Sequence, residues 1–92
     1  MLRFEWDERK RFSNLRKHDI DFADVFRVFD TEMLTKVDDR FDYGEIRHLS
    51  LGILFGAVVA ISYVDNDDSV RIISARRAEK HEQENYFREI RD

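Results

Sequence analysis

The chain has 92 residues, of which 42% are hydrophobic and 39% are charged, and its formal net charge is −4. This apolar content excludes a disordered chain and predicts one small domain, residues 1–92, with a modest core. The sequence contains no cysteine, which excludes disulfides and thiolate metal sites. No apolar run approaches the ~20 residues that span a bilayer. The charged opening residues are unlike a signal peptide, so we expect a cytoplasmic location.

The first half of the chain predicts one strand and two helices. Residues 2–6 alternate in the manner of a strand. Asp7 is a suitable N-cap for a helix that ends near Lys17, and Asp21 is one for a second helix. The expected buried stripe of the second helix is Phe22, Val25, Phe26 and Phe29.

The second half predicts strands and a last helix. Gly52 indicates a bulge or a close backbone approach. The expected elements are strands at 33–37, 46–54, 56–64 and 69–76, a polar connection at 38–45, turns at 55–56 and 65–68, and a helix at 77–90. The fold class is therefore α+β, with an antiparallel sheet, two N-terminal helices and one C-terminal helix.

The strand VVAISYV is apolar on both faces, so both faces of the sheet are expected to be covered. Three short helices can cover one face and a margin of the other. A partner chain or a second copy is one explanation for the remaining cover, and a self-contained core is the other.

Charge is unevenly distributed along the chain. The formal net charge is +3 for residues 1–18, −6 for residues 19–45 and +1 for residues 70–92. This pattern is compatible with an anionic ligand at one place and a basic partner at another, although a solvated mixed surface also explains it. The candidate contacts for a basic partner are Asp38, Asp39 and Asp42.

Polar side chains interrupt the three central strands, and they are the candidate functional residues. They are Arg47, His48, Tyr63, Arg71 and Arg76. Strict alternation places Arg71 with Ala75 on one face and Arg76 with Ile72 on the other, although bulges would change this assignment. The structural alternative is that these arginines pair with acids such as Glu45.

Other candidates also have structural explanations. His48 can be an ordinary strand residue, and the Tyr63 ring can serve packing alone. Lys17 and His18 are expected to complement the helix dipole. Arg77 is expected to begin the last helix, where its charge opposes the dipole, which favours a functional role.

Several stretches resemble the BrnT family of toxins. FEWDERKRFSNLRKHDIDFADVFRVFD matches the opening pattern of that family, and YGEIRHLSLG, VVAISYV and RIISARRA resemble its later motifs. The resemblance covers nearly the whole chain. It implies a fold similar to RelE-type ribonuclease toxins, and a toxin of a type II toxin–antitoxin system that cleaves RNA and arrests translation. It also implies a BrnA-like antitoxin with a ribbon-helix-helix DNA-binding domain, which represses the operon jointly with the toxin and alone contacts operator DNA.

RNA cleavage without a metal requires a base, an acid and cations that offset charge on the phosphorane. Arg76, followed by Arg47 and Arg71, is the candidate for phosphate contacts, because guanidinium matches phosphate oxygens. His48 and Tyr63 are the candidates for proton transfer. Further candidate RNA contacts are Arg77, Lys80 and His81. We expect no cofactor and no metal site, since the three histidines lack ligand spacing. The alternative function is a catalytically silent interaction module that acts only as a co-repressor.

Overall fold

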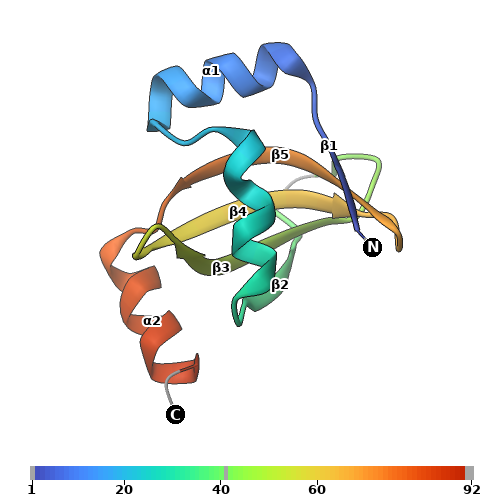
Figure 1. Ribbon diagram of the computed structural model, residues 1–92. Helices are drawn as coiled ribbons and strands as arrows, with labels where there is room; N and C mark the ends of the chain where they lie inside the picture. The colour runs from blue at the N-terminus through green and yellow to red at the C-terminus, as the bar shows by residue number, and fades with distance from the viewer. Residues whose placement is uncertain (1, 41, 91–92) are drawn as a thin grey trace.

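Five strands form one sheet in the order β1-β5-β4-β3-β2 (Figure 1). The computed structural model describes residues 2–40 and 42–90, so Met1, Phe41, Arg91 and Asp92 of the predicted domain lie outside it. The elements are β1 (Arg3–Glu5), α1 (Glu8–His18), the 3₁₀ helix η1 (Phe22–Asp30), β2 (Leu34–Asp38), β3 (Arg47–Leu54), β4 (Ala57–Asp65), β5 (Ser69–Arg77) and α2 (Lys80–Ile90). The predicted α+β class and order of elements are confirmed. The sheet is not purely antiparallel as predicted, because β1 pairs with β5 in parallel.

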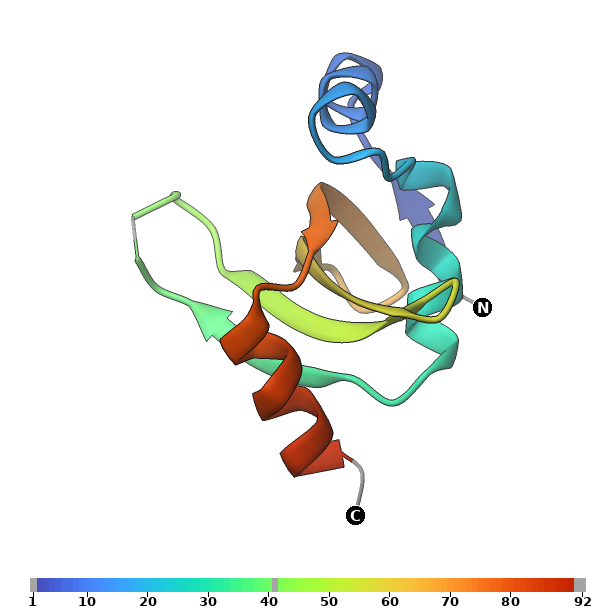
Figure 2. The same cartoon turned by 90° about the vertical axis from the view of Figure 1, so that its left-hand side faces the viewer.

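The helices lie on both faces of the sheet (Figure 2). Helix α1 packs on β5, and η1 packs on β3 and β5, while α2 contacts β2 and β3 from the other side. None of the helices in residues 2–40 and 42–90 has the length and apolarity that crossing a membrane requires.

The central strand β4 is buried from Val58 to Val64, as its apolar sequence predicted. On one face, Val59, Ile61 and Tyr63 belong to the core beneath η1. On the other face, Val58 and Ala60 pack with Tyr86 of α2. The chain itself therefore covers both faces, and the apolar strand gives no argument for a partner.

The second helix is a 3₁₀ helix, and this changes which side chains it buries. A 3₁₀ helix has three residues per turn, so positions i, i+3 and i+6 share one face. Phe22, Val25 and Val28 follow this spacing and are fully buried. The predicted stripe was therefore wrong for Phe26, which is 42% exposed, and it missed Val28.

The close backbone approach predicted at Gly52 is confirmed. A Cβ atom added there would lie 2.5 Å from Cγ1 of Val28, so only glycine lets η1 pack this closely on β3. The bulge lies elsewhere. Gly52 pairs regularly with Val59, whereas the register between β4 and β5 shifts at Ser62 and Tyr63.

This bulge changes which side chains of β5 share a face. Ser62 pairs with Ser74 but Tyr63 pairs with Ile72, so Ile73 is the extra residue. Ile72 and Ala75 therefore both point into the core beneath α1 and η1. Arg71 and Arg76 share the opposite face, and strict alternation was wrong to separate them.

The last helix begins three residues later than predicted. Arg77 is the last residue of β5, where it pairs with Val59, and the N–H of Ala78 still donates to the carbonyl of Val58 at 3.0 Å. A carboxylate oxygen of Glu82 accepts the N–H of Glu79 at 2.8 Å, which satisfies a free donor at the start of α2. The prediction that Arg77 begins this helix was therefore wrong.

Candidate functional site

A cationic cleft lies where the end of α1 meets the end of β5. Its volume is about 530 Å³. It is lined by Lys17, His18, Arg40, Arg76, Arg77 and Glu79. Four of these side chains are lysine or arginine and one is a carboxylate, so the cleft suits an anion.

The buried side chain of Asn14 fixes α1 on β5 at this point. Its amide nitrogen donates to the carbonyls of Ala75, at 2.8 Å, and Ile20, at 3.0 Å. Its amide oxygen accepts the N–H of Ala75 at 3.1 Å. Lys17 and His18 follow one turn later in α1, while Arg76 follows Ala75 in β5. Asn14 therefore sets the position of the two cationic segments relative to each other.

The basic residues at the end of α1 also fit the local backbone. Lys17 and His18 occupy the last turn, where positive charge complements the helix dipole, and Asp19 ends the helix in a left-handed conformation. The predicted structural role of Lys17 and His18 is compatible with this placement. It does not exclude their contribution to the cleft.

Arg76 is paired, whereas Arg77 is open to solvent. Nη1 and Nη2 of Arg76 donate to the two carboxylate oxygens of Glu82 at 2.8 and 3.0 Å. These bonds raise the pKa of Arg76, and they lower the pKa of Glu82. The positive charge of Arg40, which lines the same cleft, opposes this rise in the pKa of Arg76. Arg77 makes no ion pair with any residue that the structure describes.

Arg47 and Arg71 lie in a second cluster on the same sheet face as Arg76. Both guanidinium groups donate to Glu45, Arg71 at 2.6 Å and Arg47 at 3.2 Å. These bonds lower the pKa of Glu45, and the bond from Arg71 has the larger effect. Arg47 also stacks on Tyr43, with Cζ 3.9 Å from the ring centroid. From the strand rise, the Cα atoms of Arg71 and Arg76 are roughly 15 Å apart. Their guanidinium groups are held by different carboxylates, Arg71 by Glu45 and Arg76 by Glu82.

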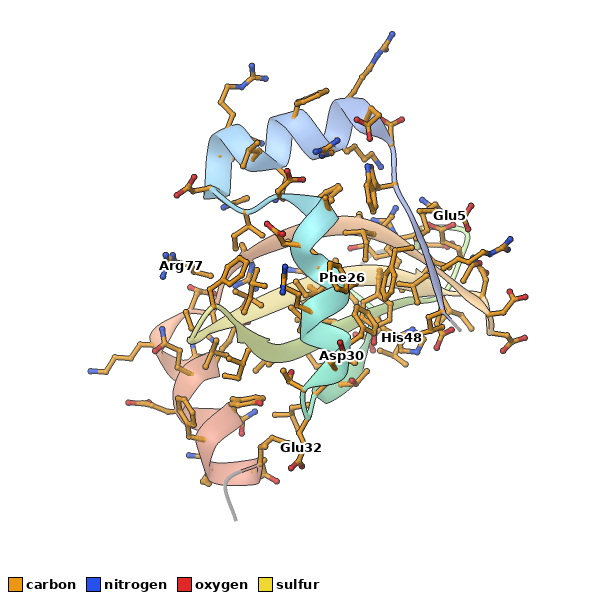
Figure 3. All side chains as sticks on the ribbon, viewed as in Figure 1. Glu5, Phe26, Asp30, Glu32, His48 and Arg77 are labelled. Atoms are coloured by element: carbon orange, nitrogen blue, oxygen red, sulfur yellow. The ribbon has the colours of Figure 1, made fainter. Side chains whose placement is uncertain are left out.

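His48 and Tyr63 lie on the face beneath η1, opposite Arg47, Arg71 and Arg76. Their rings stack with centroids 5.7 Å apart. The hydroxyl of Tyr63 is 2.7 Å from Oγ of Ser50, which in turn is 2.7 Å from Oγ1 of Thr35. Tyr63 is only 4% exposed. Figure 3 shows His48 and Arg77 toward opposite ends of the sheet. The structure does not bring His48 and Tyr63 together with the cationic cleft.

The remaining RNA-contact candidates lie at the start of α2. Lys80 and His81 are exposed, and His81 lines a separate cavity of about 550 Å³ between α2 and the β2–β3 pair. Among residues 2–40 and 42–90, Glu79, His81 and Glu82 are close enough to hold a metal ion. The spacing of the three histidines gave no indication of this group, which combines one histidine with two glutamates. Both oxygens of Glu82 already bind Arg76.

The three acidic partner candidates have different surroundings. Asp38 is buried and accepts bonds from Arg40 at 2.8 and 2.9 Å, which lower its pKa to about 2. Asp39 and Asp42 are exposed, and Asp42 accepts the N–H of Gly44. Only Asp39 and Asp42 are therefore accessible to a partner.

The fold and the cleft together define a small α+β domain with a cluster of basic side chains at one end of its sheet. Comparison with protein families gives a match over residues 6–82 to the ribonuclease toxin, BrnT, of type II toxin–antitoxin systems. The chain belongs to this family. It is similar to the 1.1 Å crystal structure of the Brucella abortus ribonuclease toxin BrnT, with 29% identity and a TM-score of 0.66. That similarity covers 87% of this chain and 100% of the other. The comparison with curated protein sequences gives no match.

The sequence indicated two of the six residues that line the cleft. Arg76 and Arg77 were predicted to contact RNA, and both line it. Lys17 and His18 were assigned only to the helix dipole, and Arg40 was not singled out. Two adjacent basic pairs, at 17–18 and 76–77, were the available signal. Their proximity depends on the contact between Asn14 and Ala75, which are 61 residues apart.

Proposed function

We propose that this ribonuclease toxin binds the RNA backbone in the cationic cleft and cleaves it there without a metal ion. The observation that carries the proposal is the convergence of Lys17 and His18 from α1 with Arg76 and Arg77 from β5. A phosphodiester needs several cations at one point, since charge on the phosphoryl oxygens grows in the transition state. The fork of an arginine matches two of these oxygens.

The proposed step is attack of a ribose 2′-hydroxyl on the adjacent phosphorus. The O2′–P bond forms, the P–O5′ bond breaks, and the products are a cyclic phosphate and a 5′-hydroxyl. One group removes the proton of the 2′-hydroxyl and another protonates the leaving 5′-oxygen. His18 and Glu79 are the groups of the cleft that can exchange protons, while Lys17, Arg76 and Arg77 offset the phosphate charge.

This proposal changes the roles of several predicted residues. Arg76 and Arg77 keep their role as RNA contacts. Arg47 and Arg71 hold Glu45, and thus the connection between β2 and β3, against the sheet. They remain candidates only for a more distant phosphate of the same RNA. His48 and Tyr63 become candidates for packing, because Tyr63 is buried in the core beneath η1 and the ring of His48 stacks on it.

A silent interaction module is the second candidate function. The observation that favours it is that carboxylates already neutralise the arginines, Arg76 through Glu82 and both Arg47 and Arg71 through Glu45. Expressing the chain alone in a bacterium distinguishes the two. Growth arrest together with RNA cleavage by the purified chain supports the nuclease. Harmless expression and intact RNA support the module.

We further propose that a BrnA-like ribbon-helix-helix antitoxin neutralises the chain, and that operator DNA is contacted through the antitoxin alone. The exposed Asp39 and Asp42 are candidate contacts for its basic side chains, and they act mainly on the association rate. Replacing both with Lys should slow association with the antitoxin and weaken its dependence on salt. If the association rates of the wild type and the variant depend equally on ionic strength, Asp39 and Asp42 do not contact the antitoxin.

A further inference from the structure

Phe55 occupies the tip of the β3–β4 hairpin in a conformation that does not suit phenylalanine. Its φ is +48°, and that of Gly56 is +84°. A two-residue turn with two positive φ values favours Asn-Gly, because a bulky side chain is strained in the left-handed region. The ring is nevertheless 73% exposed to solvent. Neither the local backbone nor burial explains a phenylalanine here.

Arg27 of η1 joins Phe55 to a second exposed ring. Its Cζ lies 5.5 Å from the ring centroid of Phe55 and 5.1 Å from that of Phe26. These cation–π contacts restrain the exposed ring of Phe55. Arg27 covers at most one face of that ring, so the other can receive a planar group. We call Phe26, Arg27 and Phe55 the aromatic platform.

The aromatic platform adjoins the cationic cleft through Arg77. A small cavity of about 140 Å³ has Phe55 and Arg77 among its lining residues, and Arg77 also lines the cleft. The cavity is smaller than the range of about 300–1,000 Å³ that is typical of whole-ligand sites, so it suits a single ring. Figure 3 shows the Arg77 side chain projecting from the sheet at the hairpin end.

Charge favours a base over a phosphate in this small cavity. Asp19, Asp21 and Asp24 also line it. Asp21 is paired with Arg11 and Asp24 with Arg27, so Asp19 is the carboxylate that most directly disfavours a phosphate. Carboxylates accept hydrogen bonds from the amino groups of bases, whereas the neighbouring cleft offers cations. The two adjoining sites thus match the alternation of base and phosphate along a single strand.

We propose that Phe55 is a stacking platform for one unpaired base of the RNA whose phosphate lies at Arg77. This inference rests on the proposed function, because it assumes that RNA occupies the cleft. Stacking on an aromatic ring tolerates every base, so the platform adds affinity for single-stranded RNA without specifying its sequence. It also explains why the hairpin keeps a strained residue.

The test measures binding of a short, end-labelled, single-stranded RNA by fluorescence anisotropy. The RNA carries 2′-O-methyl groups so that it is not cleaved. Phe55→Asn should weaken RNA binding by about 5- to 100-fold. The melting temperature of this variant should be higher than that of the wild type, because Asn tolerates positive φ. Phe55→Trp should keep the affinity. Phe12→Ala, which removes an exposed ring from α1, is the matched control and should bind as the wild type does.

An RNA of the same length without bases separates stacking from phosphate binding. The wild type and Phe55→Asn should bind this RNA equally. If Arg77→Ala weakens binding of the normal RNA but Phe55→Asn does not, stacking is rejected and the proposed function stands. If the wild type binds no RNA, both proposals fail. If Phe55→Asn binds the antitoxin more weakly but binds RNA as the wild type does, the aromatic platform is a protein contact and the inference is wrong.

Discussion

Arg76 and Glu82 form a two-pronged ion pair at the edge of the cationic cleft, with N–O distances of 2.8 and 3.0 Å. Their side chains are 30% and 13% exposed, so the pair is only partly screened by water. An RNA phosphate must compete with Glu82 for the guanidinium group of Arg76. We therefore expect the pair to reduce the affinity of the proposed RNA site.

Glu82→Gln should increase RNA affinity about two- to fivefold, because it removes the competing charge. The amide oxygen of Gln can still accept the N–H of Glu79 at the start of α2. The measurement is the Kd for a short single-stranded RNA. Glu84→Gln makes the same change in net charge at an exposed position of α2, and its effect should be smaller. Equal effects of the two variants would show that only total charge matters.

Asn14→Ala should lower the free energy of unfolding by about 1–3 kcal/mol, because three buried backbone groups lose a partner. It should also weaken RNA binding, since α1 no longer holds Lys17 and His18 against β5. Chemical denaturation measures the first effect and anisotropy the second. Asn85→Ala, which removes an exposed bond to Arg88, is the control. A variant with full RNA affinity would mean that Asn14 only stabilises the fold.

RNA cleavage by the purified chain should persist in excess EDTA, because cations of the protein itself offset the phosphate charge. The relevant alternative is the group Glu79, His81 and Glu82, whose ligand atoms lie within 4.8 Å of one another. Loss of cleavage in EDTA, with recovery in magnesium, would reject the metal-independent mechanism. In that case His81→Ala should raise the magnesium concentration that restores activity.

Asp38 should make the fold sensitive to acid. Hydrogen bonds from Arg40 lower its pKa from the ordinary 3.8 to about 2. The ionised carboxylate therefore stabilises the fold above pH ~4, and this contribution is lost as the pH falls from ~4 to ~2. Asp38→Asn should be less stable than the wild type at pH 6, with a difference that shrinks over this interval. Asp39→Asn is the exposed control. A difference independent of pH would contradict this assignment.

The sequence predicted the elements because their patterns are local. Asp7 and Asp21 cap helices as expected, and Phe55-Gly56 forms the expected turn. The bulge at Ile73 was not predictable, because it depends on the register between two strands. It decides that Arg71 and Arg76 share a face. The predicted stripe missed Val28, because the spacing of Phe22, Val25 and Val28 suits a 3₁₀ helix and an α-helix alike.

The site was harder to predict because its parts are distant in sequence. Arg76 and Arg77 stood out as charges at the end of an apolar strand. Lys17 and His18 had a sufficient local explanation in the helix dipole. The packing of α1 on β5, which includes the contact of Asn14 with Ala75, brings them to the cleft. His48 and Tyr63 share strands with the arginines, but side chains on one strand can face opposite sides of a sheet.

The claim that RNA is cleaved in the cationic cleft is tested most directly by the rate of RNA cleavage. This rate is measured for the purified wild type and for Arg76→Ala, Arg77→Ala and Arg88→Ala. Arg88 is an exposed arginine of α2 outside the cleft, so its variant controls for the loss of one positive charge. We predict that Arg76→Ala and Arg77→Ala each lower the rate about 100-fold or more, with cooperative unfolding retained, while Arg88→Ala cleaves as the wild type does. If Arg76→Ala and Arg77→Ala both cleave RNA at the wild-type rate, the cationic cleft is not the site of cleavage.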